Sequence, residues 1–300
     1  MNLFLTRACD QGCAFCYARD WLGSAPEDEL GLEALWPALE HYAALVRLAG
    51  PPVPGDPLAA SAGTVNLLGG EPTAHPDFGD LVRRLRSLGL GVNLFTSGAN
   101  PEVVRSVASD LWFVTINGRF AQRAPSLGVE LARVCAHLPL RPGDDVAALL
   151  EVVAAAGLRS AVLAFAAPAG GAAGPFFTPD DVQAMAALAA AAQAAADRLG
   201  ITIGWDCAPP RCVLPDGPGR CVPVPVLEAD GMVSVCGGAY VLADRRRPLL
   251  GFDSLDALHG WAQGIYRELA ARPSPFAACR DCPERDQGCY GMCLGFREAP

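Results

Sequence analysis

The chain has 300 residues, of which 51% are apolar and only 18% are charged. At about 150 residues per domain, this length predicts one large globular domain or two, and the high apolar fraction argues against disorder. A net charge of −9 argues against a nucleic-acid partner, because phosphate binding needs a basic surface. The sequence contains neither a signal peptide nor an apolar stretch suited to a membrane, so we expect a cytoplasmic protein.

Short apolar and β-branched runs alternate with amphipathic helical patterns from residue 2 to about residue 205. Six of these runs are predicted to be strands: Leu3–Thr6, Val65–Leu68, Val92–Thr96, Trp112–Ile116, Val134–Leu138 and Ala161–Phe165. Strands that alternate with helices favour a parallel sheet with right-handed crossovers. Six units are too few for a closed barrel of eight, so we predict an α/β fold with an open, partial (β/α)6 barrel.

Capping residues and helix breakers mark the ends of the predicted helices. Asp144 is predicted to cap one helix, and Thr178 is predicted to open a long Ala-rich helix that ends at Gly200. The segment 118–131 has little helical period. We therefore expect the fourth crossover helix to be truncated or missing, which would leave one flank of the barrel thin.

The 12 cysteines are unevenly distributed, and in a reducing compartment they indicate metal binding or catalysis. Directly after the first predicted strand, Cys9, Cys13 and Cys16 follow a Cx3Cx2C spacing. Three thiolates on one loop can hold three irons of a 4Fe–4S cluster, and the fourth iron then stays open to a small chelating molecule. A zinc site that lacks one ligand is the alternative.

A second motif, Gly69-Gly70-Glu71, follows the second predicted strand. The glycines let the backbone approach a ligand closely, and Glu71 offers a carboxylate to a cationic amine. Together with the cysteine triplet, this turn resembles the radical SAM family. The resemblance implies that S-adenosylmethionine binds the open iron of a 4Fe–4S cluster. It also implies a 5′-deoxyadenosyl radical that takes a hydrogen atom from the substrate.

The resemblance also implies a set of residues for each ligand. Cys9, Cys13 and Cys16 would hold the cluster. Thr115 would contact the methionine carboxylate or the ribose, and Asn117 stands where the family pattern has aspartate. The whole set implied to bind S-adenosylmethionine is Tyr17, Gly69, Gly70, Glu71, Thr96, Ser97, Thr115 and Asn117.

Residues 206–300 are predicted to form a second, smaller domain behind the barrel of residues 1–205. Cys221 and Cys236 enclose a Cx9Gx4C pattern that suits a β-hairpin turning at Asp230-Gly231. A Cx2Cx6Cx3C group follows a predicted helix further along the chain. These patterns resemble the SPASM extension of radical SAM enzymes, which holds two auxiliary iron–sulfur clusters.

By position, the resemblance gives the first auxiliary cluster Cys212, Cys221, Cys236 and Cys293, and the second Cys279, Cys282 and Cys289. The family supplies one more cysteine downstream, which does not occur here. The second cluster would then keep an open iron, be completed by Asp281 or Cys207, or be absent. A structural zinc site at the Cx2Cx6Cx3C group is the alternative.

These features favour an enzyme that oxidatively cross-links or dehydrogenates a ribosomally made peptide, with an auxiliary cluster accepting an electron. We expect a separate leader-binding protein as a partner, and flavodoxin or ferredoxin as the electron donor. One alternative is oxidation or rearrangement of a sugar or amino-acid metabolite. Peptide epimerisation is another, with Cys135 or Cys207 returning a hydrogen atom to the substrate. An iron–sulfur electron carrier would leave the Gly69-Gly70-Glu71 turn unexplained.

Overall fold

The structure is a computed structural model that describes residues 1–16, 18–20, 22, 31–49, 63–166, 174–207, 209–217, 219, 222–235, 245–273, 277–285 and 287–289. These residues form a sheet of 10 strands in the order β10-β9-β8-β1-β2-β3-β4-β5-β6-β7. The strands are β1 (Asn2–Phe4), β2 (Thr64–Leu68), β3 (Gly91–Thr96), β4 (Phe113–Asn117), β5 (Val134–Leu140), β6 (Ser160–Phe165), β7 (Thr202–Trp205), β8 (Pro225–Leu227), β9 (Met232–Val235) and β10 (Arg247–Pro248).

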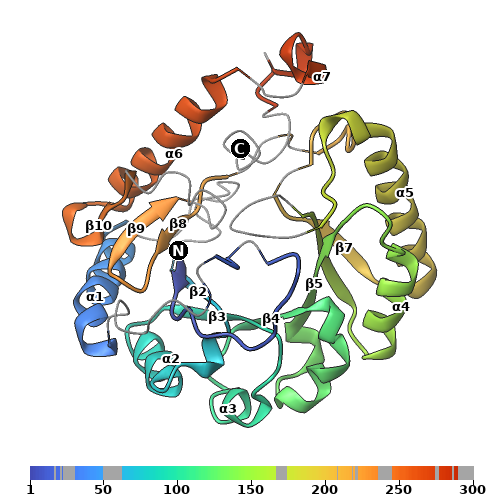
Figure 1. Cartoon of the computed structure of the whole chain (residues 1–300). Helices are drawn as coiled ribbons and strands as arrows, with labels where there is room; N and C mark the ends of the chain where they lie inside the picture. Colours follow the sequence, from blue (N-terminus) through green and yellow to red (C-terminus); the bar gives the residue numbers. More distant parts are fainter. Residues whose placement is uncertain are drawn as a thin grey trace.

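Strands β1 to β7 are parallel neighbours in chain order, and β8 joins the other side of β1 in parallel. The α-helices are α1 (Leu32–Ala49), α2 (Phe78–Ser87), α3 (Pro101–Arg105), α4 (Val146–Ala155), α5 (Val182–Leu199), α6 (Leu255–Ala271) and α7 (Ala277–Arg280). Helices α1 to α5 lie around the outside of the curved sheet (Figure 1). The predicted α/β class and the open, partial barrel are therefore confirmed.

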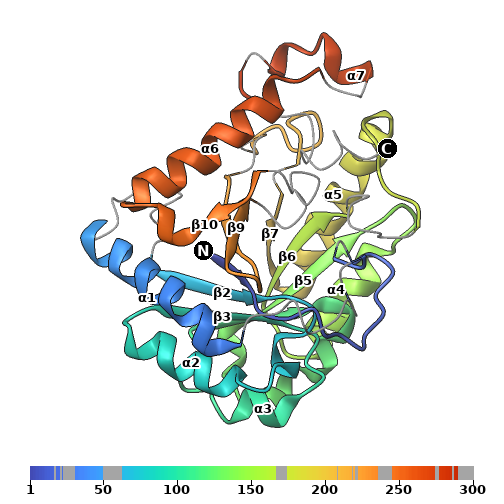
Figure 2. The ribbon, with the colours of Figure 1, turned by 60° about the vertical axis from the view of Figure 1, so that its left-hand side comes forward.

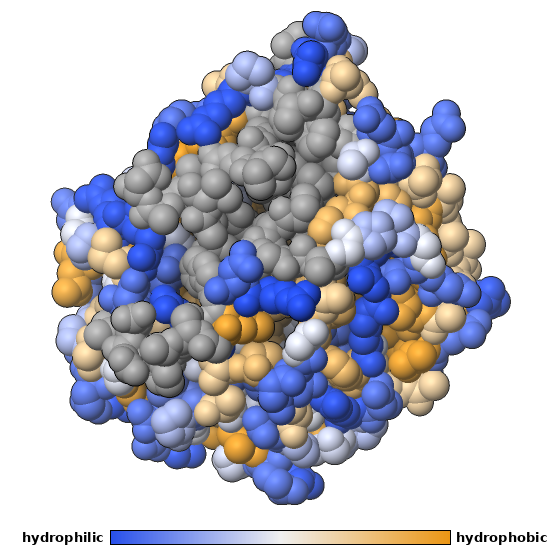
Figure 3. Space-filling model, in the orientation of Figure 1, coloured by the Kyte–Doolittle hydropathy of each residue, from blue (hydrophilic) through white to orange (hydrophobic). Residues whose placement is uncertain are grey.

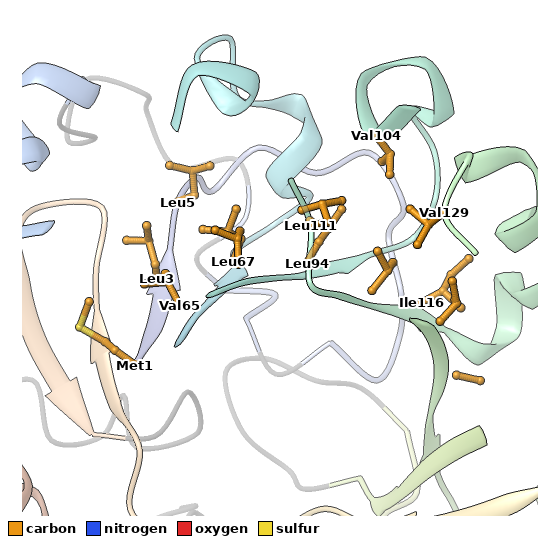
Figure 4. Close-up of a cluster of buried hydrophobic side chains, with 14 of the residues drawn as sticks. Met1, Leu3, Leu5, Val65, Leu67, Leu94, Val104, Leu111, Ile116 and Val129 are labelled. Carbon is orange, nitrogen blue, oxygen red and sulfur yellow. The ribbon is translucent and has the colours of Figure 1, made fainter. Parts of the chain in front are cut away.

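The core lies between the outer face of the sheet and these helices. Side chains such as Leu3, Leu67, Leu94 and Ile116 are fully buried there (Figure 4). Each such side chain contributes about 1.5–3 kcal/mol through burial of apolar surface. Because side chains alternate along a strand, the residues between them point to the opposite, inner face of the barrel. That inner face carries the candidate site.

The six predicted strands correspond to β1 to β6, and a further parallel strand, β7, continues the sheet. The segment 118–131 contains 3₁₀ turns in place of an α-helix, with non-helical backbone at Phe120, as expected. The predicted cap at Asp144 is wrong by one residue. The side chain of Asp145 accepts the capping hydrogen bond from the Ala148 N–H, while Asp144 accepts one from the Arg141 N–H.

The C-terminal segment continues the same sheet. Strands β8 and β9 form an antiparallel hairpin that turns at Asp230-Gly231, as predicted, and Gly231 has a φ of +81°. Helix α6 lies beside the β8–β9 hairpin (Figure 2), and Val235 of β9 packs with Ile265 of α6. Strands from before and after residue 205 belong to one sheet, in which β8 pairs with β1. The sheet therefore marks no boundary at residue 205, and the division into two domains there remains a prediction.

Hydrophilic residues are distributed over much of the face shown in Figure 3, and apolar residues gather on the side of α4 and α5. The helices that the structure describes include none with the length and hydropathy needed to cross a membrane.

Candidate active site

The cysteine loop and the glycine turn lie against each other at the carboxyl ends of β1 and β2. The Gly70 N–H donates to the Thr6 carbonyl over 2.6 Å, and the Glu71 N–H donates to the Ala8 carbonyl over 2.8 Å. Because β1 and β2 are adjacent and parallel, the segments that follow them leave the sheet at the same edge. The two motifs that are separated in sequence therefore form one unit in the fold.

The two glycines are required by this contact. At Gly69, where φ is +147°, a Cβ atom would lie 2.5 Å from the Thr6 carbonyl oxygen. At Gly70, a Cβ atom would lie 2.2 Å from the Ala8 carbonyl oxygen and 2.9 Å from the Cys9 Cβ. The close approach that we expected the glycines to give a ligand is made by the chain's own cysteine loop.

Glu71 is 2% exposed, and its carboxylate joins the ends of β2 and β3. Its Oε1 accepts hydrogen bonds from the hydroxyls of Thr73 and Thr96 over 2.6 and 2.7 Å, and from the Thr73 N–H over 3.3 Å. Its Oε2 accepts from the N–H and the hydroxyl of Ser97, both over 2.7 Å. The expected partner was a cationic amine, whereas the contacts within the chain are with hydroxyl and amide donors.

Thr115 and Asn117 lie on the inner face of β4, because Val114 and Ile116, which alternate with them along the strand, pack into the outer core. The Asn117 Oδ1 accepts a hydrogen bond from the Arg119 N–H over 3.1 Å. This contact starts the 3₁₀ segment Gly118–Leu127. Asn117 thus has a structural role at the position where the family pattern has aspartate.

Two arginines of this segment reach the cysteine loop, and no local motif in the sequence signals their position. The guanidinium of Arg123 donates to the Gln11 side-chain oxygen over 3.3 Å and to the Ser97 carbonyl over 3.1 Å. Arg119 lies over the Phe15 ring, with 5.4 Å to its centroid, and its guanidinium pairs with Asp144 over 2.9 Å. Both arginines place positive charge beside the loop.

Cys9, Cys13 and Cys16 are half-buried and form no disulfide. Burial raises the pKa of each thiol, and the negative charges of Cys16 and Cys9 raise the pKa of Cys13 further. The three thiols therefore lie within electrostatic range of one another. Three soft thiolate donors on one loop fit an iron–sulfur cluster. Tyr17, which the family resemblance places among the residues that bind S-adenosylmethionine, lies outside the described residues.

Throughout the part of the chain that the structure describes, no three His, Cys, Asp or Glu side chains converge as they would around a single bound metal ion. The thiol of Cys16 lies at the border of a small apolar cluster formed by Phe4, Ala18 and Val226 on the inner side of the sheet. This cluster shields one side of the cysteine loop from water.

The two cysteines considered as hydrogen-atom donors differ in position. Cys135 is 4% exposed and lies opposite Thr115, on the inner face of β5. Cys207 is exposed, follows β7, and has a φ of +56°. Near it, the His137 Nε2 lies 3.6 Å from the Asp206 Oδ2.

A buried carboxylate on the inner face was not found by sequence reasoning. Glu228 follows β8 and is 3% exposed, and it pairs with the Arg246 guanidinium over 2.9 Å. Burial raises the pKa of Glu228, and the positive charge of Arg246 offsets only part of this shift. The sequence feature that could have indicated this position is the predicted hairpin. Side chains alternate between the two faces of a strand, and Leu227 packs into the outer core, so Glu228 faces the inner side.

Among the C-terminal cysteines, the structure describes Cys212, Cys279, Cys282 and Cys289. Cys221, Cys236 and Cys293 lie outside the described residues. Of the four cysteines expected to hold the first auxiliary cluster, the structure therefore describes Cys212 alone. Cys279 and Cys289 are buried.

Comparison with known proteins gives a match of fold and none of sequence. No known protein family matches the chain, and no curated protein sequence does. The crystal structure of Streptococcus suis SuiB bound to S-adenosylmethionine superimposes with a TM-score of 0.62 at 13% identity, over 98% of this chain and 71% of SuiB. The chain has the fold of SuiB.

A second SuiB structure, bound to the precursor peptide SuiA, has a TM-score of 0.59 at 12% identity and covers 99% of this chain and 70% of SuiB. The resemblance carried by the cysteine and glycine motifs is thus confirmed at the level of the fold. The likeness to SuiB extends over nearly the whole chain, including the segment that follows β7.

Proposed function

We propose that the chain is a radical SAM enzyme that oxidatively modifies a peptide. The observation that carries this proposal is the docking of the cysteine loop on the Gly69-Gly70-Glu71 turn, at the carboxyl ends of parallel strands. In β/α barrels this end of the sheet carries the reactive site. Cys9, Cys13 and Cys16 would hold a 4Fe–4S cluster, with one iron left for S-adenosylmethionine. When bound, the two groups supply a 5′-deoxyadenosyl radical that removes a hydrogen atom from the substrate.

The residues around the loop have separate roles in this proposal. The glycine turn fixes the height of the loop above β2, and Glu71 fixes the end of β3 relative to β2 through Thr96 and Ser97. Thr115 and Asn117 would contact the bound S-adenosylmethionine from the inner face of β4. Tyr17 would lie beside the adenine. The apolar cluster that includes Phe4 would exclude water and so limit side reactions of the radical.

The peptide substrate is supported by SuiB, which was crystallised with a precursor peptide in a fold shared over 99% of this chain. The oxidative outcome is supported by the cysteine-rich C-terminal segment, where an auxiliary cluster would accept the second electron. Flavodoxin or ferredoxin would supply the electron that starts each turnover, and a separate leader-binding protein would deliver the peptide.

Anaerobic turnover tests the proposal. The protein is reconstituted with iron and sulfide, reduced with dithionite and incubated with S-adenosylmethionine and the precursor peptide encoded nearest its gene. We expect 5′-deoxyadenosine and a peptide that is two mass units lighter. The variant Cys13→Ala should form neither product, while Cys135→Ala should still form 5′-deoxyadenosine. A complete absence of 5′-deoxyadenosine from the intact protein would overturn the assignment.

The position of Cys135 favours one alternative reaction, peptide epimerisation. Its thiol is buried on the inner face opposite Thr115, where it could return a hydrogen atom to a substrate radical. Turnover in deuterated water distinguishes the two reactions. Epimerisation would leave the peptide one mass unit heavier, and Cys135→Ala would abolish that gain. The oxidative reaction would leave no solvent deuterium on carbon, and Cys207→Ala provides the matching exposed-thiol control.

A further inference from the structure

Three of the chain's five asparagines lie side by side on the inner face of the barrel. Asn2 of β1 is the register partner of Asn66 of β2, and Asn66 is the register partner of Asn93 of β3. The residues that follow them, such as Leu67 and Leu94, pack into the outer core, so the three amides point inward. This row of three residues is called the asparagine ladder below.

The amides of the ladder are hydrogen-bonded in one direction. The Asn93 Nδ2 donates to the Asn66 Oδ1 over 2.8 Å, and the Asn66 Nδ2 donates to the Asn2 Oδ1 over 2.8 Å. An amide nitrogen carries two hydrogens, and each of these bonds uses one of them. Among the residues that the structure describes, no hydrogen bond is made by the Asn2 Nδ2 or by the Asn93 Oδ1. The ladder therefore has unused donors along its length and an unused acceptor at Asn93.

The ladder is partly exposed and is bordered by apolar side chains. All three asparagines keep part of their surface accessible to solvent, although they lie inside the barrel. In the same row, Val226 of β8 flanks Asn2, and Phe113 of β4 flanks Asn93. The next inward-facing row, toward the cysteine loop, is formed by Phe4, Leu68 and Phe95. A ligand can therefore reach a polar strip that lies in an apolar surround.

The far wall of the barrel is open as well. Strand β7 is the last parallel strand of the sheet, away from β1 (Figure 1). Its Ile203 and Trp205 pack against the outer core, so Gly204 between them faces inward. A Cβ atom at Gly204 would meet no atom of the described residues within 4 Å. Closed barrels fill this interior with layers of side chains, whereas the described part of this barrel leaves it unfilled at both walls.

We propose that the asparagine ladder binds an amide group of the substrate peptide, either a backbone peptide group or a side-chain carboxamide. An amide presents a carbonyl acceptor and an N–H donor, which complement the unused donors and the unused acceptor of the ladder. A carboxylate or an ammonium group would need an opposite charge, and the side chains that border the ladder are apolar. Hydrogen bonds in such a site discriminate against a ligand that lacks the matching groups. That the ligand is a peptide rests on the proposed function, whereas the preference for an amide does not.

The position of the ladder predicts a spacing within the substrate. Each asparagine lies two or three residues before the end of its strand. The ladder is therefore about 7–10 Å below the edge that carries the cysteine loop and the glycine turn. An extended peptide advances about 3.3 Å per residue. The bound amide should thus lie about two or three residues from the peptide position that is modified.

Peptide binding tests the inference without turnover. Fluorescence anisotropy measures the affinity of the full-length protein for the precursor peptide encoded nearest its gene. Each backbone amide of the peptide is replaced in turn by an ester, which removes the N–H donor, and each Asn or Gln side chain is replaced in turn by leucine. We expect one replacement to weaken binding about tenfold. In Asn93→Leu that same replacement should have almost no further effect, because the acceptor is already absent.

The matched control is Asn100→Leu. The Asn100 amide donates to the Thr73 hydroxyl over 3.1 Å, outside the ladder, so the full effect of the peptide replacement should persist in this variant. An ester that couples to Asn93 identifies a backbone amide as the ligand, and a leucine replacement that couples identifies a carboxamide. If no replacement loses its effect in Asn93→Leu, or if the intact protein does not bind the peptide, the inference is overturned.

A second measurement applies if Asn93→Leu does not fold. The unaltered full-length protein, labelled with ¹⁵N-asparagine, has five side-chain amide signals and is titrated with the unlabelled peptide. The signals of the ladder should shift with the saturation seen by anisotropy, and the signal of Asn100 should stay in place. Ladder signals that do not move at saturation would refute the inference.

The two proposals can fail separately. If the coupling pattern holds while the intact protein forms no 5′-deoxyadenosine, only the proposed function fails. If a modified peptide forms while no peptide group couples to Asn93, only the role of the ladder fails.

Discussion

Replacing Glu71 by glutamine should destabilise the fold by about 2–4 kcal/mol. The carboxylate accepts from five donors, supplied by Thr73, Thr96 and Ser97, and all of these residues are at least nine-tenths buried. A glutamine side chain has one acceptor oxygen. Whichever way its amide is turned, at least two buried donors lose their acceptor. Each buried donor without a partner costs about 1–3 kcal/mol, and the remaining bonds lose their charge-assisted strength.

The measurement is urea unfolding of the cluster-free protein, followed by circular dichroism, with Glu102→Gln as the matched control. Glu102 is exposed on α3, so its change should stay within about 0.5 kcal/mol. A double-mutant cycle with Ser97→Ala should give a coupling free energy of about 0.5–3 kcal/mol. If Glu71→Gln unfolds at the same urea concentration as the unaltered protein, the carboxylate does not hold the two strand ends together, and the reasoning fails.

Three further changes have defined outcomes. Gly70→Ala should displace the cysteine loop and so reduce the iron bound after reconstitution. The control is Gly260→Ala in α6, where the added Cβ would meet nothing within 4 Å and should stabilise the helix by about 0.5–1 kcal/mol. Undiminished iron in Gly70→Ala would refute the requirement for glycine at this contact. Arg123→Gln should speed limited proteolysis of the cysteine loop, because the hydrogen bond from Arg123 to Gln11 is lost. Arg83→Gln, on an exposed helix face, should leave the cleavage rate unchanged. Equal cleavage rates in the two variants would show that Arg123 does not hold the loop in place. Burial raises the pKa of Glu228, so folding favours the protonated carboxyl group. The contribution of Glu228 to the free energy of unfolding is therefore fully present below its unfolded pKa and is lost as the pH rises through its folded pKa. The stability of the unaltered protein should therefore fall relative to Glu228→Gln as pH is raised from about 4 to neutral, and a constant difference would exclude this effect.

The sheet could be predicted well from the sequence because its outer face has a strong apolar pattern. Strands such as β3 and β4 bury alternate residues completely, which gives a clear period of two. Strand β7 was missed because its four residues include exposed positions and follow a long Ala-rich helix. The cap at Asp144 was misplaced because Asp145 is the same residue type, and only the contact with Arg141 decides between them.

The site could be predicted in part, for a physical reason. The cysteine loop and the glycine turn are local motifs, so their residues could be named from spacing alone. The contact between Arg123 and Gln11 joins positions 112 residues apart, and nothing in either neighbourhood signals it. The partners of Glu71 lie at the end of β3, and they become apparent only when β2 and β3 are known to be adjacent. The asparagine ladder depends in the same way on tertiary structure, because it forms only when β1, β2 and β3 are adjacent.

The pairing of β8 with β1 has a consequence for how the protein can be dissected. Strand β1 leads directly into the cysteine loop, and it hydrogen-bonds to β2 on one side and to β8 on the other. A fragment that stops after β7 would leave β1 with an open edge, and such an edge invites aggregation. Attempts to produce the N-terminal portion alone should therefore yield insoluble material, and co-expression of the missing portion should recover it.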